Sequence, residues 1–214
     1  MHSRDHAQLV PKLNLPDQLH AEIVDHIRTQ RVIPSLMQIN SSTGRTVWER
    51  ILFQYYFGNK GKFQVYRLED DLEMRIRNNY KKFLDQFAVP PKIRLKSSKY
   101  VRAFPPHSDA GYPGGDTASL TVPIVTNGET TSWYDAGPEF KMSWSSLRRL
   151  RKITSLTLGP NHACLFNNKA VHDVTNCKPG AERYVLVIGW RDVEFDQLIN
   201  TYSNLEKNNY DFVD

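Results

Sequence analysis

The sequence contains only two cysteines, Cys164 and Cys177, and it lacks any long apolar segment. Two thiols cannot build a multiply cross-linked disulfide scaffold, and so low a cysteine content is typical of proteins in a reducing compartment. No stretch approaches the roughly eighteen apolar residues that a membrane-spanning helix requires. The residues from Met1 to His6 also lack the apolar core of a secretory signal. We therefore expect a cytoplasmic protein without a membrane segment.

The sequence also lacks internal repeats, low-complexity segments and a strong excess of one charge. Its 214 residues carry a net charge of +5, and 24% of them are charged, which is ordinary for one globular domain. The basic run from Arg148 to Lys152 has no accompanying nucleic-acid recognition motif, so a solvated surface is the better interpretation. We expect a single domain and no nucleic-acid partner; the sequence does not determine the oligomeric state.

Apolar spacing divides this single domain, residues 1–214, into three parts. In residues 1–92 apolar side chains recur about every four positions, which predicts mostly helical support. The expected helices there begin at Pro16, span Thr46 to Phe57, and span Leu68 to Phe87. Residues 93–192 contain short strand-like runs separated by turn residues, and residues 193–214 predict a C-terminal helix and tail.

Many short strands of this kind predict a mainly β fold with supporting helices and a jelly-roll core. The expected strands are 94–104, as one long strand or a strand pair, and then 119–125, 130–135, 156–158, 163–166, 171–176 and 183–190. Within them, Pro123 indicates a sheet edge or a bulge. The dipeptide Asn127-Gly128 indicates a hairpin turn.

A candidate metal-binding pattern follows the first of these strands. His107 and Asp109 are two positions apart, so on a short loop that leaves a strand both side chains can point toward one ion. His172 lies 63 positions beyond Asp109 (172 − 109) and offers a third ligand. Two imidazoles and one carboxylate on one side of an ion form the facial triad of non-haem Fe(II) sites. Asp173 should point to the opposite face of its strand, so we do not assign it as a ligand.

A cation follows these ligands on the last strand of the predicted core. Arg183 lies 11 positions after His172 (183 − 172) and opens the apolar run that ends at Trp190. A guanidinium at the inner start of a barrel strand would be a costly buried charge unless it met an anion. It binds a carboxylate through two parallel hydrogen bonds. The chain therefore combines a candidate iron site with a cation suited to a dicarboxylate.

The segment His107-Ser108-Asp109, with His172 and Arg183, resembles the pattern of the Fe(II)/2-oxoglutarate-dependent oxygenases, and most of all the prolyl-hydroxylase-type branch. The resemblance covers about half of the chain, and it implies a double-stranded β-helix core. It also implies Fe(II) held by the triad, 2-oxoglutarate bound by Arg183, O2 as a further substrate and ascorbate as a supporting reductant. Halogenating members of this family carry a small residue where Asp109 stands, so the resemblance implies hydroxylation.

The chain departs from those family members that carry a serine two positions after the arginine. Val185 occupies that position here, so another polar side chain must help to bind 2-oxoglutarate. The resemblance implies Tyr100 for this role, with a barrel-filling aromatic as the alternative, and Thr121 is a weaker candidate. The loop from Gly111 to Gly115 should flank the open side of the iron.

Two other classes of function are compatible with these residues. One is a cupin-like metal enzyme that uses the same triad without 2-oxoglutarate, and Arg183 argues against it. The other is a non-catalytic jelly-roll binding protein, and the presence of all three ligand residues argues against that. For an oxygenase, the resemblance alone favours an amino-acid side chain in a peptide as the substrate, with a free small molecule as the alternative.

Overall fold

The computed structural model describes residues 6–29, 31, 33–34, 62–99, 103–111, 115–136, 140 and 144–208. The helix predicted from Thr46 to Phe57 and the candidate residue Tyr100 lie outside the described residues. The same holds for the middle of the loop from Gly111 to Gly115.

Two antiparallel sheets form the core. Among the described residues, the larger sheet has seven strands in the order β1-β9-β6-β11-β4-β3-β2, and the smaller has four in the order β5-β10-β7-β8. From β4 to β11 the chain crosses repeatedly between the sheets, which confirms the predicted double-stranded β-helix or jelly roll. In chain order the strands are β1 (Ala7–Leu9), β2 (Ile33–Pro34), β3 (Lys62–Arg67), β4 (Lys92–Lys99), β5 (Phe104–His107), β6 (Ala118–Val125), β7 (Thr130–Asp135), β8 (Arg151–Thr157), β9 (Cys164–Asn167), β10 (His172–Thr175) and β11 (Glu182–Trp190).

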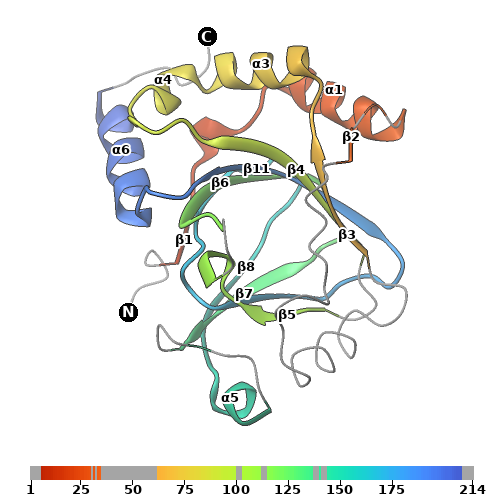
Figure 1. Ribbon diagram of the computed structural model, residues 1–214, viewed down its shortest axis with the longest axis vertical. Helices are drawn as coiled ribbons and strands as arrows, with labels where there is room; N and C mark the ends of the chain where they lie inside the picture. The colour runs from red at the N-terminus through yellow and green to blue at the C-terminus, as the bar shows by residue number, and fades with distance from the viewer. Residues whose placement is uncertain are drawn as a thin grey trace.

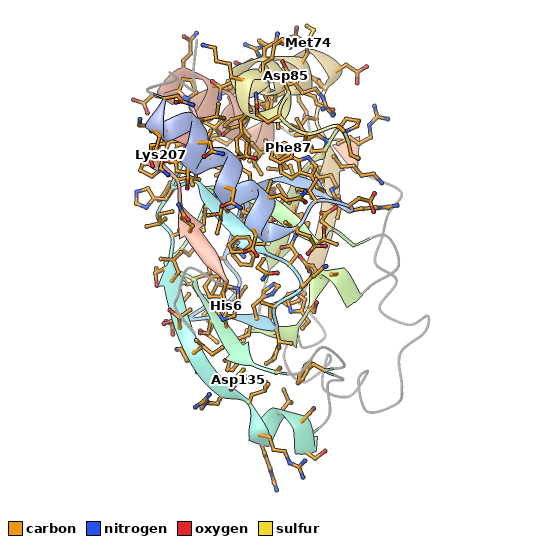
Figure 2. The ribbon with its side chains drawn as sticks, turned by 90° about the vertical axis from the view of Figure 1, so that its left-hand side faces the viewer. His6, Met74, Asp85, Phe87, Asp135 and Lys207 are labelled. Atoms are coloured by element: carbon orange, nitrogen blue, oxygen red, sulfur yellow. The ribbon has the colours of Figure 1, made fainter. Side chains whose placement is uncertain are left out.

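Helices cover the outer face of the larger sheet, and the smaller sheet lies on its other side (Figure 1). Figure 2 shows the same separation from the side, with Met74 and Asp85 in the helical layer and Asp135 toward α5 at the far end. None of the described helices has the length and apolar character needed to cross a membrane. The helices are α1 (Asp17–Arg28), α3 (Asp70–Asn79), α4 (Lys81–Leu84), α5 (Trp144–Arg149) and α6 (Phe195–Lys207), with short 3-10 turns η2 (Pro11–Leu13) and η3 (Asp109–Gly111).

Residues 68–87 form two helices and not the single long helix that the spacing predicts. Tyr80, between α3 and α4, has φ −99° and ψ 9°, which interrupts the helical path. Its buried hydroxyl donates a hydrogen bond to the Leu13 carbonyl oxygen at 3.0 Å. Both helices bury apolar residues in the same core, so the periodicity continues across the break and does not reveal it.

Three strands lie in the part of the chain that the spacing predicts as mostly helical. β1 adds to one edge of the larger sheet, and β3 followed by β2 adds to the other. The alternation of polar and apolar residues along Lys62–Arg67 was the available signal for β3. β1 and β2 span three and two residues, too short for any period to be read.

Of two local predictions, one is confirmed and the other is wrong in part. Pro123 lies at a bulge, one of the two positions that the sequence predicts for it, because the register between β6 and β11 shifts between Tyr184 and Val185. β6 itself is an inner strand of the larger sheet. The segment Asn127-Gly128 does form a turn, in which Gly128 has φ +87°. It links β6 to β7, which belong to different sheets, so the prediction of a hairpin is wrong.

The strands of the larger sheet bury alternate residues on its two faces. The outer, helix-facing side holds the main hydrophobic core, which includes Leu95, Leu120, Leu186, Ile188 and Trp190. A smaller apolar cluster of Trp133, Leu158, Cys164 and Phe166 joins the two sheets. The rest of the inner face carries polar and charged side chains together with the buried valines Val65, Val185 and Val187, and the candidate site lies among them.

Candidate metal centre

His107 and His172 meet across two neighbouring strands of the smaller sheet. His107 ends β5, His172 begins β10, and the antiparallel register pairs them directly. Their ring centroids are 4.4 Å apart. The pairing of strands thus brings together two imidazoles that are 65 positions apart (172 − 107) in the sequence.

Asp109 joins the two histidines from the start of η3. Its Oδ1 atom lies 3.3 Å from His107 Nε2. The loop that carries it is braced by Asn168, whose carbonyl oxygen accepts hydrogen bonds from Ser108 Oγ at 3.0 Å and from the Ala110 amide at 3.2 Å. Asn168 lies in the turn that leads to His172. The same turn therefore fixes the loop that carries Asp109 and the start of the strand that carries His172.

The three side chains form a group that fits a metal ion. One ligand atom from each of His107, Asp109 and His172 lies within 4.8 Å of the other two. Two imidazole nitrogens and one carboxylate oxygen are the donor set of the 2-His-1-carboxylate triad, which binds Fe(II) and leaves further coordination positions open. The structure therefore brings together all three residues that the sequence analysis assigns as ligands.

His172 is held in the protonation state that a metal requires. Its Nδ1 lies 2.9 Å from the Ala170 carbonyl oxygen, and a carbonyl can only accept, so Nδ1 carries the proton and Nε2 is left as the donor atom. Burial lowers the pKa of His172 to about 4, and the neighbouring His107 contributes to this shift. The ring is therefore neutral near pH 7 and available to a cation.

Asp109 is held as a carboxylate. Burial raises its pKa, but the Lys96 ammonium and the two histidines outweigh burial and hold the pKa of Asp109 well below its ordinary value. The Lys96 Nζ atom lies 3.5 Å from Asp109 Oδ2, the oxygen that does not face His107. Asp109 therefore presents one oxygen toward the imidazoles and the other toward a cation.

Aromatic side chains surround the two histidines. The Phe104 ring centroid is 4.3 Å from that of His107, and Phe166 meets His172 edge-on at 5.2 Å. Trp133 is fully buried and pairs with His172 across β7 and β10. These rings limit the movement of the imidazoles and lower the polarity around them.

Asp173 points away from this group. It lies opposite Ser132 in the register of β10 and β7, and its Oδ2 accepts a 2.5 Å hydrogen bond from the Tyr134 hydroxyl. Burial raises the pKa of Asp173, although the hydrogen bonds from Tyr134 and Ser132 oppose that shift. Asp173 thus lies outside the group formed by His107, Asp109 and His172, on the face of β10 that strand alternation predicts.

Arg183 is the second residue of β11 in the larger sheet and lies opposite Ser98 of β4. Leu186 and Ile188 belong to the helix-facing core, so Arg183 lies on the other, inner face of this strand. Within the described part of the chain its guanidinium forms no hydrogen bond or ion pair. Burial raises the pKa of Glu129, but its hydrogen bonds and the nearby charge of Arg183 outweigh burial and lower it. The arginine is therefore a cation available to a further anion.

Tyr100 and Thr121 are the other two candidates for cosubstrate binding. Tyr100 lies outside the described residues, so its role stays a prediction. Thr121 is buried on the inner face opposite Val187, and its Oγ1 atom shares a 3.2 Å hydrogen bond with Ser119 Oγ. That bond makes Thr121 less available to a ligand than Arg183.

Sequence reasoning missed two residues beside the ligands, Lys96 and Asn168. Asn168 has the appearance of an ordinary turn residue, and only the fold shows that its carbonyl braces the metal loop. The signal for Lys96 was weak but present, because Arg94, Lys96 and Ser98 alternate with less polar positions along β4. Such alternation indicates a polar inner face, but it does not show which residue meets the metal.

Comparisons with known proteins bear on the fold. No protein-family model and no curated protein matches the chain. The crystal structure of the epimerase SnoN in complex with Fe3+, alpha ketoglutarate and nogalamycin RO is similar, with a TM-score of 0.51 and 15% identity over 87% of this chain and 80% of SnoN. A Pseudomonas putida prolyl-4-hydroxylase has a TM-score of 0.43 and 12% identity over 87% of this chain and 92% of its own. HygX from Streptomyces hygroscopicus, with nickel, 2-oxoglutarate and hygromycin B bound, has a TM-score of 0.42 and 8% identity over 89% and 85%.

At such low identity the likeness to SnoN concerns the fold and not the chemistry. The two sheets and their crossing connections agree with the fold that the resemblance implies. His107 and His172 lie on the smaller sheet, and Asp109 lies beside them at the start of η3. The chain has the double-stranded β-helix fold of the Fe(II)/2-oxoglutarate-dependent oxygenases.

Proposed function

We propose that this protein is an Fe(II)/2-oxoglutarate-dependent dioxygenase that hydroxylates a C–H bond of an amino-acid side chain in a peptide or of a small molecule. The observation that carries the proposal is the convergence of His107, Asp109 and His172, whose ligand atoms lie within 4.8 Å of one another. Such a triad occupies one side of an ion and leaves positions for 2-oxoglutarate and O2. The fold shared with SnoN, which was crystallised with Fe3+ and alpha ketoglutarate, supports this proposal.

Each side chain has a distinct role in the proposed reaction. His107, Asp109 and His172 hold the metal, and the aromatic rings around the imidazoles keep bulk water away. Arg183 pairs with the distal carboxylate of 2-oxoglutarate through charge-assisted hydrogen bonds. When bound, Fe(II) supplies the oxidation of the C–H bond with O2, while 2-oxoglutarate is converted to succinate and carbon dioxide. Ascorbate would serve only to keep the iron reduced.

Asp109 decides which atom is transferred to the substrate. Its carboxylate would hold the metal at the position that a halide would otherwise need, and Lys96 and the histidines keep the carboxylate ionised by lowering its pKa. We therefore expect a product that has gained oxygen, or one derived from such a product, and no chlorinated product. Mass spectrometry of reactions in chloride buffer checks this, and a chlorinated product from the unaltered protein would mean that Asp109 does not bind the iron.

The substrate class is left to experiment. The protein is incubated with Fe(II), ascorbate and 2-oxoglutarate, together with separate pools of peptides and metabolites, and substrate-dependent succinate is measured. A gain in mass of one oxygen atom in a peptide or in a small molecule then identifies the class. The Asp109→Ala variant is the matched control, because it removes one ligand and should leave the fold intact.

Two results would replace the proposal. Turnover of a substrate by the metal-loaded protein without 2-oxoglutarate would indicate the cupin-like enzyme. Absence of stoichiometric metal from protein purified and reconstituted under anaerobic conditions would indicate a non-catalytic binding protein.

A further inference from the structure

Lys96 places a positive charge directly beside the candidate metal centre. Its Nζ atom lies 3.5 Å from Asp109 Oδ2, and its side chain is only 22% exposed. The residues opposite it on the neighbouring strands are Val65 of β3 and Val185 of β11, both buried. The alkyl stem therefore lies between two valines, and the ammonium has no polar cross-strand partner.

The other acidic side chain near Lys96 is already paired. Asp116 is 3% exposed and accepts a hydrogen bond from Arg94, with which it forms an ion pair on the same inner face. In the part of the chain that the structure describes, Asp109 is the only carboxylate within ion-pair distance of Lys96. Asp109 is thus the ion-pair partner of Lys96, and the proposed function uses the same carboxylate as a metal ligand.

A metal ion on Asp109 changes the balance of charge around Lys96. The two imidazoles are neutral ligands, so a divalent ion on this triad retains one net positive charge after Asp109 is counted. The ammonium then lies beside a cationic centre, and the two repel each other in a partly buried site where screening is weak. A dianion that approaches both cations removes this repulsion.

We propose that Lys96 is a second cosubstrate-binding residue, which holds the metal-binding end of 2-oxoglutarate while Arg183 holds its distal carboxylate. This inference rests on the proposed function. Val185 stands where some members of the resembled family carry a helper serine, and Lys96 lies directly across from it on β4. The lysine opposes metal binding on its own and favours it once the dianion is present, so metal and cosubstrate bind cooperatively.

The test compares Lys96→Met with Lys92→Met, which makes the same change at an exposed position of the same strand. Fe(II) affinity is measured anaerobically by calorimetry, first without 2-oxoglutarate. The affinity of the iron-loaded protein for 2-oxoglutarate is then measured from the visible absorbance that develops on chelation. Circular dichroism and thermal unfolding establish that each variant is folded.

The two affinities of Lys96→Met should move in opposite directions. Fe(II) binding alone should become about threefold to tenfold tighter, because a neighbouring charge is removed. Binding of 2-oxoglutarate should become roughly tenfold to a hundredfold weaker, as expected for loss of a charge-assisted hydrogen bond. Lys96→Arg should restore most of the cosubstrate affinity, and Lys92→Met should change neither value.

Other outcomes overturn the inference in distinguishable ways. If Lys96→Met weakens Fe(II) binding and leaves 2-oxoglutarate affinity unchanged, the lysine only positions Asp109. If both affinities equal those of the parent, Lys96 has no role in the site, and the proposed function stands without it. If the parent itself binds no 2-oxoglutarate in the presence of Fe(II), the proposed function and this inference both fail.

Discussion

The two faces of the larger sheet carry opposite chemistry, although the same strands supply both. The helix-facing side of β4, β6 and β11 presents Leu95, Leu120, Leu186 and Ile188, all fully buried in one apolar core. The inner side of these strands presents Arg94, Lys96, Ser98, Ser119, Thr121 and Arg183.

This difference separates stability from chemistry within single strands. Burial of apolar area against α1, α3, α4 and α6 supplies the free energy of folding, and it requires nothing polar. The inner face can therefore carry charges that would be costly in a core, provided that each meets a partner or a ligand. Substitutions on the outer face should mainly lower stability, whereas neutral replacements of the inner-face cations Lys96 and Arg183 should mainly change ligand affinity.

The largest effect should come from the metal ligands. His107→Ala, Asp109→Ala and His172→Ala each remove one of three protein ligands, so Fe(II) binding should fall below detection at micromolar protein while thermal unfolding changes little. His162→Ala is the matched control, because His162 lies in a turn outside the cluster. Calorimetric titration with Fe(II) measures this, and an Asp109→Ala variant that binds iron like the parent would show that the triad is misassigned.

The next largest effect should be a difference in stability loss between two adjacent positions of β11 that lie on opposite faces of the sheet. Leu186 is fully buried among the helices, so Leu186→Ala should cost about 2–5 kcal/mol of unfolding free energy through lost burial and a cavity. Val187→Ala, one position along and on the inner face, removes fewer atoms and should cost less. Denaturant titration gives both values. Equal losses at the two positions would contradict a larger contribution of the outer face to stability.

Arg183→Gln should affect ligand binding and not the fold. The neutral amide keeps much of the side chain but loses the charge that pairs with a carboxylate, so 2-oxoglutarate affinity should fall by about ten- to a hundredfold. Fe(II) affinity and the free energy of unfolding should stay near those of the parent. An unchanged cosubstrate affinity in the folded variant would remove Arg183 from the site.

A smaller loss of stability should follow from Gly189→Ala, at the inner end of β11. A Cβ atom there would collide with the Asp116 carboxylate and crowd the Arg94 guanidinium, so the glycine makes room for their ion pair. Displacing this buried pair should cost about 1–3 kcal/mol, the usual cost of overpacking. Denaturant titration against Asp116→Asn tests the cause, because Gly189→Ala should cost less once the ion pair is already broken.

Much of the fold could be predicted because local patterns report burial. The period-four stripes predicted α1 and α6, and the short strand-like runs after residue 92 predicted most strands of the jelly roll. Most of β5 and of β8 lies outside the ranges expected for strands, because these segments lack a clear apolar alternation. The break at Tyr80 escaped prediction because the apolar face continues across it. The turn at Asn127-Gly128 was recognised, but local chemistry cannot show whether the strand that follows pairs with the one before or crosses to another sheet.

The sequence by itself determined the donor set of the candidate site. Residue types and their spacing singled out His107, Asp109, His172 and Arg183, because few side chains can bind a metal or a carboxylate. Only the tertiary structure showed that the three ligands converge, that Asn168 braces their loop and that Lys96 reaches Asp109. The two histidines come from neighbouring strands of the smaller sheet, and Lys96 comes from the larger sheet. The distances among these residues depend on strand register and on sheet packing, which no local pattern encodes.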